Sequence, residues 1–161
     1  MKAAALGSLM AGARAELAQA VSERLGSSDT PHYRALTSDE LRSRVAQLVE
    51  AFVGGFTDPE ALGLHVRQLA DERQHEGFRL EELQVALSAL EECAWRVAER
   101  AVTDVAVLVP RLAAVSGSLG RAKDELARAF LDRSLAAERH AKALELRLAD
   151  LFKGTEEAPI D

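Results

Sequence analysis

Arg73-Gln74-His75-Glu76-Gly77-Phe78-Arg79-Leu80-Glu81-Glu82-Leu83 is the stretch that decides the fold, because it joins two amphipathic helical patterns through a Gly-Phe corner. Gly77 is suited to end the first helix, since glycine readily adopts the left-handed backbone conformation of a helix C-cap. Phe78 lies just outside both patterns, where its ring can pack back over the corner. The stretch therefore predicts two helices that meet at a tight turn.

Helical periodicity continues on both sides of this corner. Two helices have clear start signals: Thr37 and Glu40 have the spacing of a capping box. Asp58 precedes Pro59 as an N-cap precedes the first helical residue. The loop predicted over residues 26–31 ends in a proline, which cannot continue a helix. Apolar residues at spacings of three and four predict four helices before the last element, over residues 3–25, 37–54, 58–77 and 80–102.

The last element is predicted to begin at Val109-Pro110 and to keep a helical period to about Lys153. If it is unbroken, it spans roughly 44 residues and about 65 Å at 1.5 Å per residue, which a small domain is too short to cover. Two explanations are consistent with this length. Either Gly117 and Gly120 break the helix, or its outer half packs on a partner.

The outer half of this element carries large apolar residues at spacings of three and four, which predicts an interface. Burial stabilises each such side chain by roughly 1.5–3 kcal/mol relative to leaving it in water. A twofold partner achieves this burial by self-complementary packing. We therefore expect a homodimer, held by the final helix with help from the N-terminal one. The interface candidates are Leu144, Leu148, Leu151 and Phe152.

Composition fits one all-α domain. The chain has 161 residues, of which 48% are hydrophobic but only 4% aromatic, so leucine, valine and alanine must supply the core. We expect five or six helices in a single domain over residues 1–153, followed by a frayed acidic tail over residues 154–161. The net charge of −6 argues against nucleic-acid binding. We expect no membrane association either, because no segment approaches the roughly 20 consecutive apolar residues of a membrane span.

The single cysteine, Cys93, excludes an intramolecular disulfide and fits a reducing compartment. It is expected to be a buried structural thiol. Met1-Lys2 and the alanines that follow have some features of a signal peptide, but the helical pattern runs through them to Leu25. We therefore expect a cytoplasmic protein.

No catalytic or metal-binding motif is present, so we expect neither an enzyme nor a bound cofactor. His65 stands beside an apolar stripe, as a haem-binding histidine would, but a packed histidine at a helix interface is the favoured interpretation. Glu72 and His75 have the spacing of a di-iron ligand pair, yet the second pair that such a site needs is missing. His65 and His140 are the candidates for phosphorylation, which leaves a histidine phosphotransfer protein as one alternative.

The stretch from Tyr33 to about Arg100 resembles the N-terminal sensor-type domain of RsbT co-antagonist (RsbR-like) proteins, a domain that also precedes histidine kinases and other signalling domains. The sharpest part of the pattern is the corner Arg73-x-x-x-Gly77-Phe78-x-Leu80-x-Glu82-Leu83. The other matching residues are Tyr33, Leu41, Leu48, Phe52, Asp58, Leu69, Glu81, Leu87 and Leu90.

The resemblance implies an all-helical, globin-like input domain that works without haem, is often dimeric, and is coupled to an output by its last long helix. The leading hypothesis is therefore a non-enzymatic signalling or regulatory domain that dimerises and binds a signalling protein of unknown identity. A small-ligand sensor is the other alternative. The residues predicted to line its interhelical pocket are Tyr33, His65, Arg73, Phe78 and Trp95.

Overall fold

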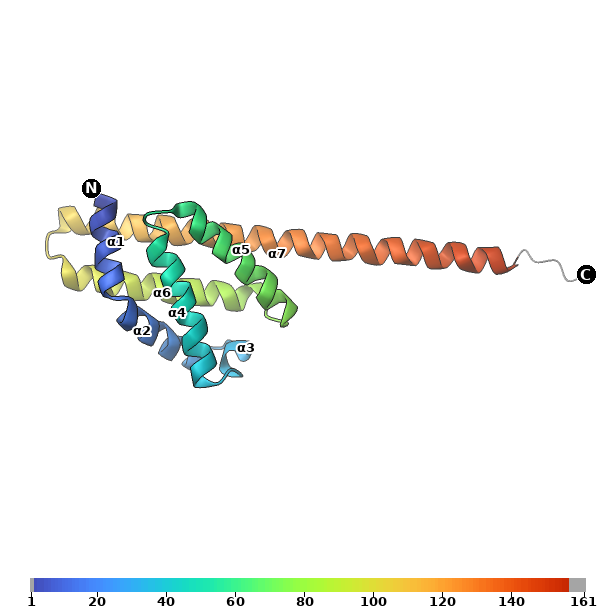
Figure 1. Ribbon diagram of the computed structural model, residues 1–161, viewed down its shortest axis with the longest axis horizontal. Helices are drawn as coiled ribbons and strands as arrows, with labels where there is room; N and C mark the ends of the chain where they lie inside the picture. The colour runs from blue at the N-terminus through green and yellow to red at the C-terminus, as the bar shows by residue number, and fades with distance from the viewer. Residues whose placement is uncertain (1, 157–161) are drawn as a thin grey trace, which may run out of the picture.

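The computed structural model describes residues 2–156, and every regular element in that range is a helix (Figure 1). This confirms the all-α prediction. The helices gather into one globular body, from which the second half of the last helix projects (Figure 1). Their bounds are α1 Lys2–Gly12, α2 Arg14–Ser27, α3 Pro31–Arg34, α4 Ser38–Gly54, α5 Pro59–His75, α6 Leu80–Ala101 and α7 Val105–Glu156. Of the tail predicted to fray, residues 157–161 lie outside the described residues.

Helices α4 and α5 begin where their sequence signals predicted. Thr37 Oγ1 accepts a hydrogen bond from the Glu40 backbone N–H at 3.2 Å, and the Glu40 carboxylate accepts one from the Thr37 backbone N–H at 2.8 Å. These two bonds complete the capping box. The Asp58 carboxylate accepts the backbone N–H groups of Glu60 and Ala61 at the start of α5. Both caps satisfy backbone donors that a first helical turn leaves without partners.

The corner after α5 is a Schellman turn. Gly77 has a φ of +90°, in the left-handed region that favours glycine, as predicted. The Phe78 backbone N–H donates to the Arg73 carbonyl oxygen at 2.9 Å. The Gly77 backbone N–H donates to the Gln74 carbonyl oxygen at 3.1 Å. These are the two hydrogen bonds that define the motif, and they turn the chain directly into α6.

The N-terminal region contains three helices where one was predicted. α1 and α2 meet at Ala13, whose backbone, with a φ of −100° and a ψ of 8°, departs from the helical conformation just after Gly12. α3 is a single turn that begins at Pro31, because proline is favourable at the first helical position. The apolar stripe of α1 and α2 is buried in the domain's own core, as Leu6 and Leu17 show. This stripe therefore serves the domain itself, and a contribution of the N-terminal helix to a dimer stays a prediction.

Helix α7 begins earlier than predicted. The backbone N–H groups of Val107 and Leu108 donate to the Asp104 carbonyl oxygen, at 3.0 and 2.9 Å. The Asp104 carboxylate accepts the backbone N–H of Ala106 at 2.9 Å. Asp104 is thus the N-cap, and Pro110 lies inside the helix, where its missing N–H removes one backbone hydrogen bond. Val109-Pro110 was wrongly chosen because a proline near a helix start is usually at the first position.

Glycines do not break α7, which runs unbroken for 52 residues, or about 78 Å. Gly117 and Gly120 each cost roughly 0.5–1 kcal/mol in a helix interior relative to alanine. Their buried neighbours Val115, Leu119 and Leu126 hold this stretch of the helix in the core, against α5 and α6. Packing therefore outweighs the low helix propensity, and the explanation that invoked a break is excluded.

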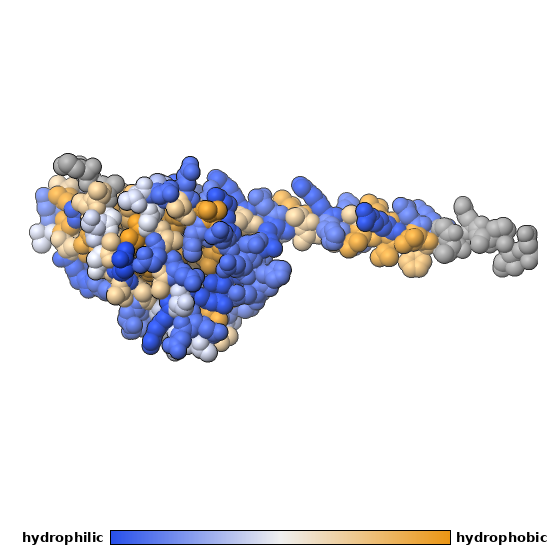
Figure 2. All heavy atoms as spheres, in the orientation of Figure 1, coloured by the Kyte–Doolittle hydropathy of each residue, from blue (hydrophilic) through white to orange (hydrophobic). Residues whose placement is uncertain are grey.

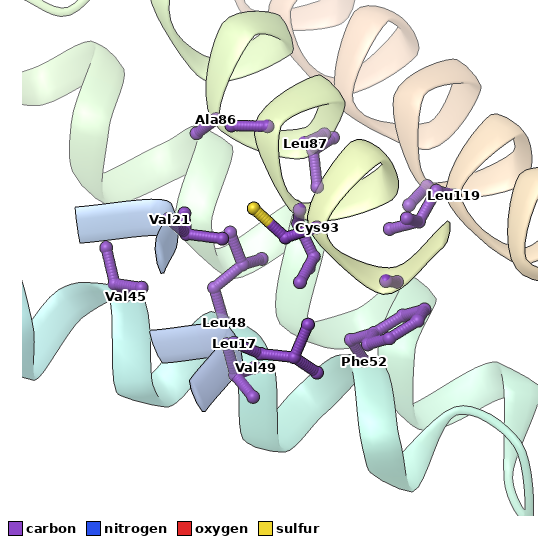
Figure 3. Close-up of a cluster of buried hydrophobic side chains, with 14 of the residues drawn as sticks. Leu17, Val21, Val45, Leu48, Val49, Phe52, Ala86, Leu87, Cys93 and Leu119 are labelled. Carbon is purple, nitrogen blue, oxygen red and sulfur yellow. The ribbon is translucent and has the colours of Figure 1, made fainter. Parts of the chain in front are cut away.

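The core lies where α2, α4, α6 and α7 meet (Figure 3). Leu17, Leu48 and Phe52 point into it from α2 and α4, facing Leu87 of α6 and Leu119 of α7. The apolar stripes predicted for α4 and α6 both face this core. The polar residues between them lie on the outer faces of the two helices, as in other amphipathic helices.

The same substitution at Gly77 and at Gly120 should change the free energy of unfolding in opposite directions. We expect Gly77→Ala to lower the free energy of unfolding by about 1–2 kcal/mol, because a β-carbon disfavours the left-handed conformation. Gly120→Ala makes the same chemical change inside α7, with no heavy atom within 4 Å of the added carbon. It should raise the free energy of unfolding by about 0.5–1 kcal/mol. Urea denaturation of both variants checks the signs, and two changes of the same sign would contradict this account.

Candidate functional site

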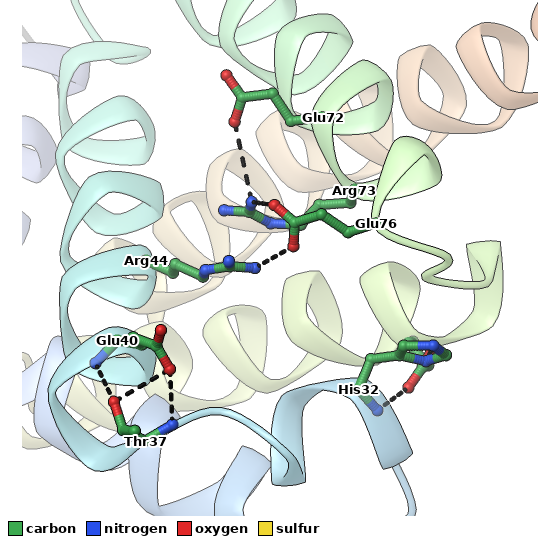
Figure 4. Close-up of polar contacts among 8 residues, drawn as sticks. His32, Thr37, Glu40, Arg44, Glu72, Arg73 and Glu76 are labelled. Carbon is green, nitrogen blue, oxygen red and sulfur yellow. Dashed lines mark hydrogen bonds and ion pairs between the residues drawn. The ribbon is translucent and has the colours of Figure 1, made fainter.

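Charged and aromatic side chains converge at the corner between α5 and α6. Figure 4 shows the charged ones, with Arg44 and Arg73 both directed at Glu76. The guanidinium carbons of Arg44 and Arg73 lie 5.8 and 5.9 Å from the centre of the Phe78 ring. The Tyr33 ring meets the Phe78 ring edge to face, with centroids 5.0 Å apart. Glu76 accepts one hydrogen bond from Arg73 at 3.0 Å and another from Arg44 at 2.7 Å. We call these five residues the corner cluster, and it ties α3 and α4 to the end of α5.

Three side chains of the corner cluster are almost fully buried. Tyr33, Arg73 and Phe78 are each at least 95% buried. Burial raises the pKa of Tyr33 to about 12, so the phenol is neutral at physiological pH. Burial also raises the pKa of the Glu76 carboxyl, but hydrogen bonds and charge from Arg44 and Arg73 outweigh it and hold that pKa below its ordinary value. The cluster is thus a compact arrangement of an aromatic pair, two cations and one anion, suited to joining helices.

Beside the corner cluster, the buried carboxylate of Glu82 joins two helix starts. One oxygen accepts the His32 backbone N–H at 2.8 Å. The other accepts the Arg79 backbone N–H at 3.0 Å and lies 2.7 Å from His32 Nδ1. Burial raises the pKa of this carboxyl, but these hydrogen bonds outweigh burial and hold the pKa below its ordinary value. Sequence reasoning missed this role, although the Arg79-x-x-Glu82 spacing is that of a capping box.

The structure brings together three of the five residues predicted to line a pocket and separates the other two. His65 of α5 lines a groove of about 720 Å³ that is shared with α4 residues such as Ser43 and Gln47. Burial lowers the pKa of His65, and its Nε2 has no hydrogen-bond partner within the described residues. Trp95 lies on α6, half-exposed, and its Nε1 donates to Ser116 of α7 at 3.2 Å.

Two further side chains bear on chemical roles. Cys93 is buried in α6, and burial raises the pKa of its thiol, which keeps the thiol protonated. This fits the structural role predicted for it. His140 is exposed on the outer half of α7, whereas the Nε2 of the other phosphorylation candidate, His65, is buried. Among the described residues, no three His, Cys, Asp or Glu side chains form a group that could hold a metal ion.

The outer half of α7, from Ser134 to Lys153, is exposed along its whole described length, and we call it the arm. Its sequence favours a helix, since residues 121–153 contain neither glycine nor proline and are rich in alanine, leucine and charged residues. Leu144 is 45% exposed and Leu148 is 54% exposed. Leu151 and Phe152 are also exposed, and hydrophobic side chains gather toward the far end of the arm (Figure 2).

Both the length and the composition of α7 set it apart from the other described helices. By these two properties alone it is long and apolar enough to cross a membrane, a criterion that core helices of globular domains also satisfy. Its first half includes buried residues that pack against α5 and α6, whereas its second half projects as the arm. No protein-family model, curated protein or solved structure gives a significant match to this chain.

The Glu82 carboxylate makes stability depend on pH in a defined direction. We expect Glu82→Gln to lower the free energy of unfolding at neutral pH by about 1–3 kcal/mol, because a neutral amide leaves buried N–H donors poorly satisfied. Since the folded pKa is depressed, the contribution of Glu82 is complete above its ordinary pKa of 4.5 and is lost as the pH falls through the folded value. The stability gap between wild type and variant should therefore narrow in acid.

Denaturant unfolding at about pH 7 and about pH 3 measures this gap. The control is Glu81→Gln, which removes the neighbouring, exposed carboxylate and should change stability little at either pH. A gap that stayed constant or widened in acid would contradict the assignment.

Proposed function

We propose that this chain is a non-enzymatic signalling or regulatory domain that forms a homodimer through its arm and binds a partner protein. The observation that carries the proposal is the exposed apolar stripe of the arm, which belongs to the same unbroken helix as the core residues Leu119 and Leu126. A globin-like arrangement without haem, a cytoplasmic location and the relationship to RsbR-like input domains are parts of the same proposal.

Dimerisation is favoured by the energetics of the arm. Burial of a large apolar side chain stabilises by roughly 1.5–3 kcal/mol, and the stripe presents several such side chains. Because α7 has no break, the arm cannot fold back to bury Leu144 and Leu148 on its own domain. A second molecule with the same arm satisfies both stripes at once, as twofold interfaces do.

A regulatory role is favoured by the way α7 connects the two parts of the molecule. Its first half contributes Val115, Leu119 and Leu126 to the core, and its second half forms the arm. A helix is stiff over this length, so a change in packing at the core displaces the arm. This is the coupling that an input domain needs in order to act on a partner protein.

A small-ligand sensor is a second candidate, favoured by the groove between α4 and α5. The groove holds the buried, unpartnered Nε2 of His65, which a ligand donor or acceptor would satisfy. Screening small metabolites by thermal shift, with His65→Ala as the matched variant, tests this role. A stabilisation that is lost in the variant would support it. For histidine phosphotransfer, no observation gives comparable support.

The dimer is tested by its dependence on the arm. We expect the intact chain to have a dimeric mass by light scattering at tens of micromolar. The double variant Leu144→Ser/Leu148→Ser, and a truncation ending at Ser134, should both be monomeric. The truncation retains Phe130, beyond which no residue of α7 up to Lys153 is buried. The truncated domain should therefore still fold, and its circular dichroism spectrum should remain helical. A monomeric intact chain would contradict the proposal, and a dimeric truncation would move the interface off the arm.

A further inference from the structure

The arm carries a heptad pattern on exposed residues, which do not pack against the core of the domain. Ala137, Ala141, Leu144, Leu148 and Leu151 follow one another at spacings of four, three, four and three residues. That alternation is the a/d repeat of a left-handed coiled coil, with Ala141 and Leu148 at a positions and the other three at d positions. Leu at d is the residue that parallel two-stranded assemblies carry at this position, and the a positions here are Ala141 and Leu148 rather than the β-branched residues usual in them.

The charges beside this seam are sorted by sign. The e positions that flank it are Glu138, Glu145 and Phe152, of which the first two are acidic. The g positions on the other side are Arg133, His140 and Arg147, which are basic residues or a histidine. In a two-stranded coiled coil these flanking positions decide partner choice and strand orientation.

The sign pattern distinguishes parallel from antiparallel pairing. In a parallel, in-register pair, each g residue faces the e residue five positions later on the other chain. Arg133 then faces Glu138 of the other copy, His140 faces Glu145 and Arg147 faces Phe152, so no like charges meet. In an antiparallel pair, e faces e and g faces g, which places Glu beside Glu and Arg beside Arg.

Resting on the proposed function, we infer that the arm pairs with the arm of a second copy as a parallel, in-register, two-stranded coiled coil. The seam is formed by the a and d residues 137–151, and the e and g charges fix orientation and register. Both globular domains then lie at the same end of the coiled coil. Arg133, at its base, also donates to the Asp71 carbonyl oxygen at 2.7 Å and forms an ion pair with the Asp71 carboxylate of its own chain, which anchors the seam to the end of α5.

Strand orientation is tested by disulfide trapping in the full chain. Cys93→Ala first removes the buried native thiol. Ala137→Cys and Leu151→Cys then each place one thiol at a d position, at opposite ends of the seam. In a parallel, in-register dimer each variant meets its own copy and forms a homodisulfide under mild oxidation. Leu146→Cys is the control, because that exposed position faces away from the seam.

The trapping experiment separates failure of this inference from failure of the proposed function. Homodisulfides at both d positions and none at residue 146 are the expected result. In an antiparallel pair a positions face d positions, so a disulfide between Ala137→Cys and Leu148→Cys when the two are mixed, without homodisulfides, shows that arrangement and overturns the inference while leaving a dimer. A light-scattering dimer with no cross-link at any position also overturns it. A monomeric mass overturns the proposed function itself.

Charge reversal provides an independent test. Glu138→Arg/Glu145→Arg makes both flanks of a parallel seam basic, and we expect the dimer dissociation constant to rise about tenfold or more at low ionic strength. In an antiparallel pair the e positions face each other, so the substitutions replace repulsion between glutamates by repulsion between arginines. An unchanged dissociation constant would therefore overturn the inference. Asp132→Arg/Asp150→Arg is the matched control, with the same change in net charge at positions outside the e and g flanks. It should leave the dissociation constant within about twofold of wild type.

Discussion

The length of one unbroken helix is the constraint on which the rest of this structure depends. α7 supplies core residues such as Leu119 and Leu126, then continues as the arm beyond anything that its own domain can cover. Helices α5 and α6 pack against its first half, and the remaining helices complete a body around them. The domain is therefore organised along α7, and the arm is continuous with a helix of the core.

The corner between α5 and α6 is the second fixed point, and its stability comes from complementary local signals. Gly77 allows the Schellman turn, and the Phe78 ring packs against Tyr33 beside it. The Glu82 carboxylate accepts hydrogen bonds from backbone donors at the starts of both α3 and α6. The cations Arg44 and Arg73 share Glu76 and lie beside the Phe78 ring. This polar and aromatic arrangement explains why the corner is the sharpest motif of the sequence: several residue types are needed at fixed spacing to make one turn.

Sequence signals predicted what is decided within a few residues. The capping box at Thr37, the cap at Asp58 and the left-handed Gly77 were found because each acts over less than one or two turns. The start of α7 was missed because Pro110 was taken for the first helical residue in place of the local cap at Asp104. The continuity through Gly120 was missed because distant packing decides it. Of the residues predicted to line one pocket, only some were predicted together correctly. Tyr33 joins Arg73 and Phe78 at the corner, whereas His65 and Trp95 face other helices, which helical periodicity alone does not specify.

The arm has a gradient in its seam that bears on how a signal would pass along it. The a and d residues nearest the domain are Ala137 and Ala141, and the larger Leu144 and Leu148 follow further out. Alanine contributes little buried area, so the proposed parallel seam is weakest beside the domains and strongest at its far end. We propose that a dimer held in this way stays associated while its bases separate or rotate. In that proposal the proximal arm is the segment in which a change in core packing alters geometry without dissociating the two copies.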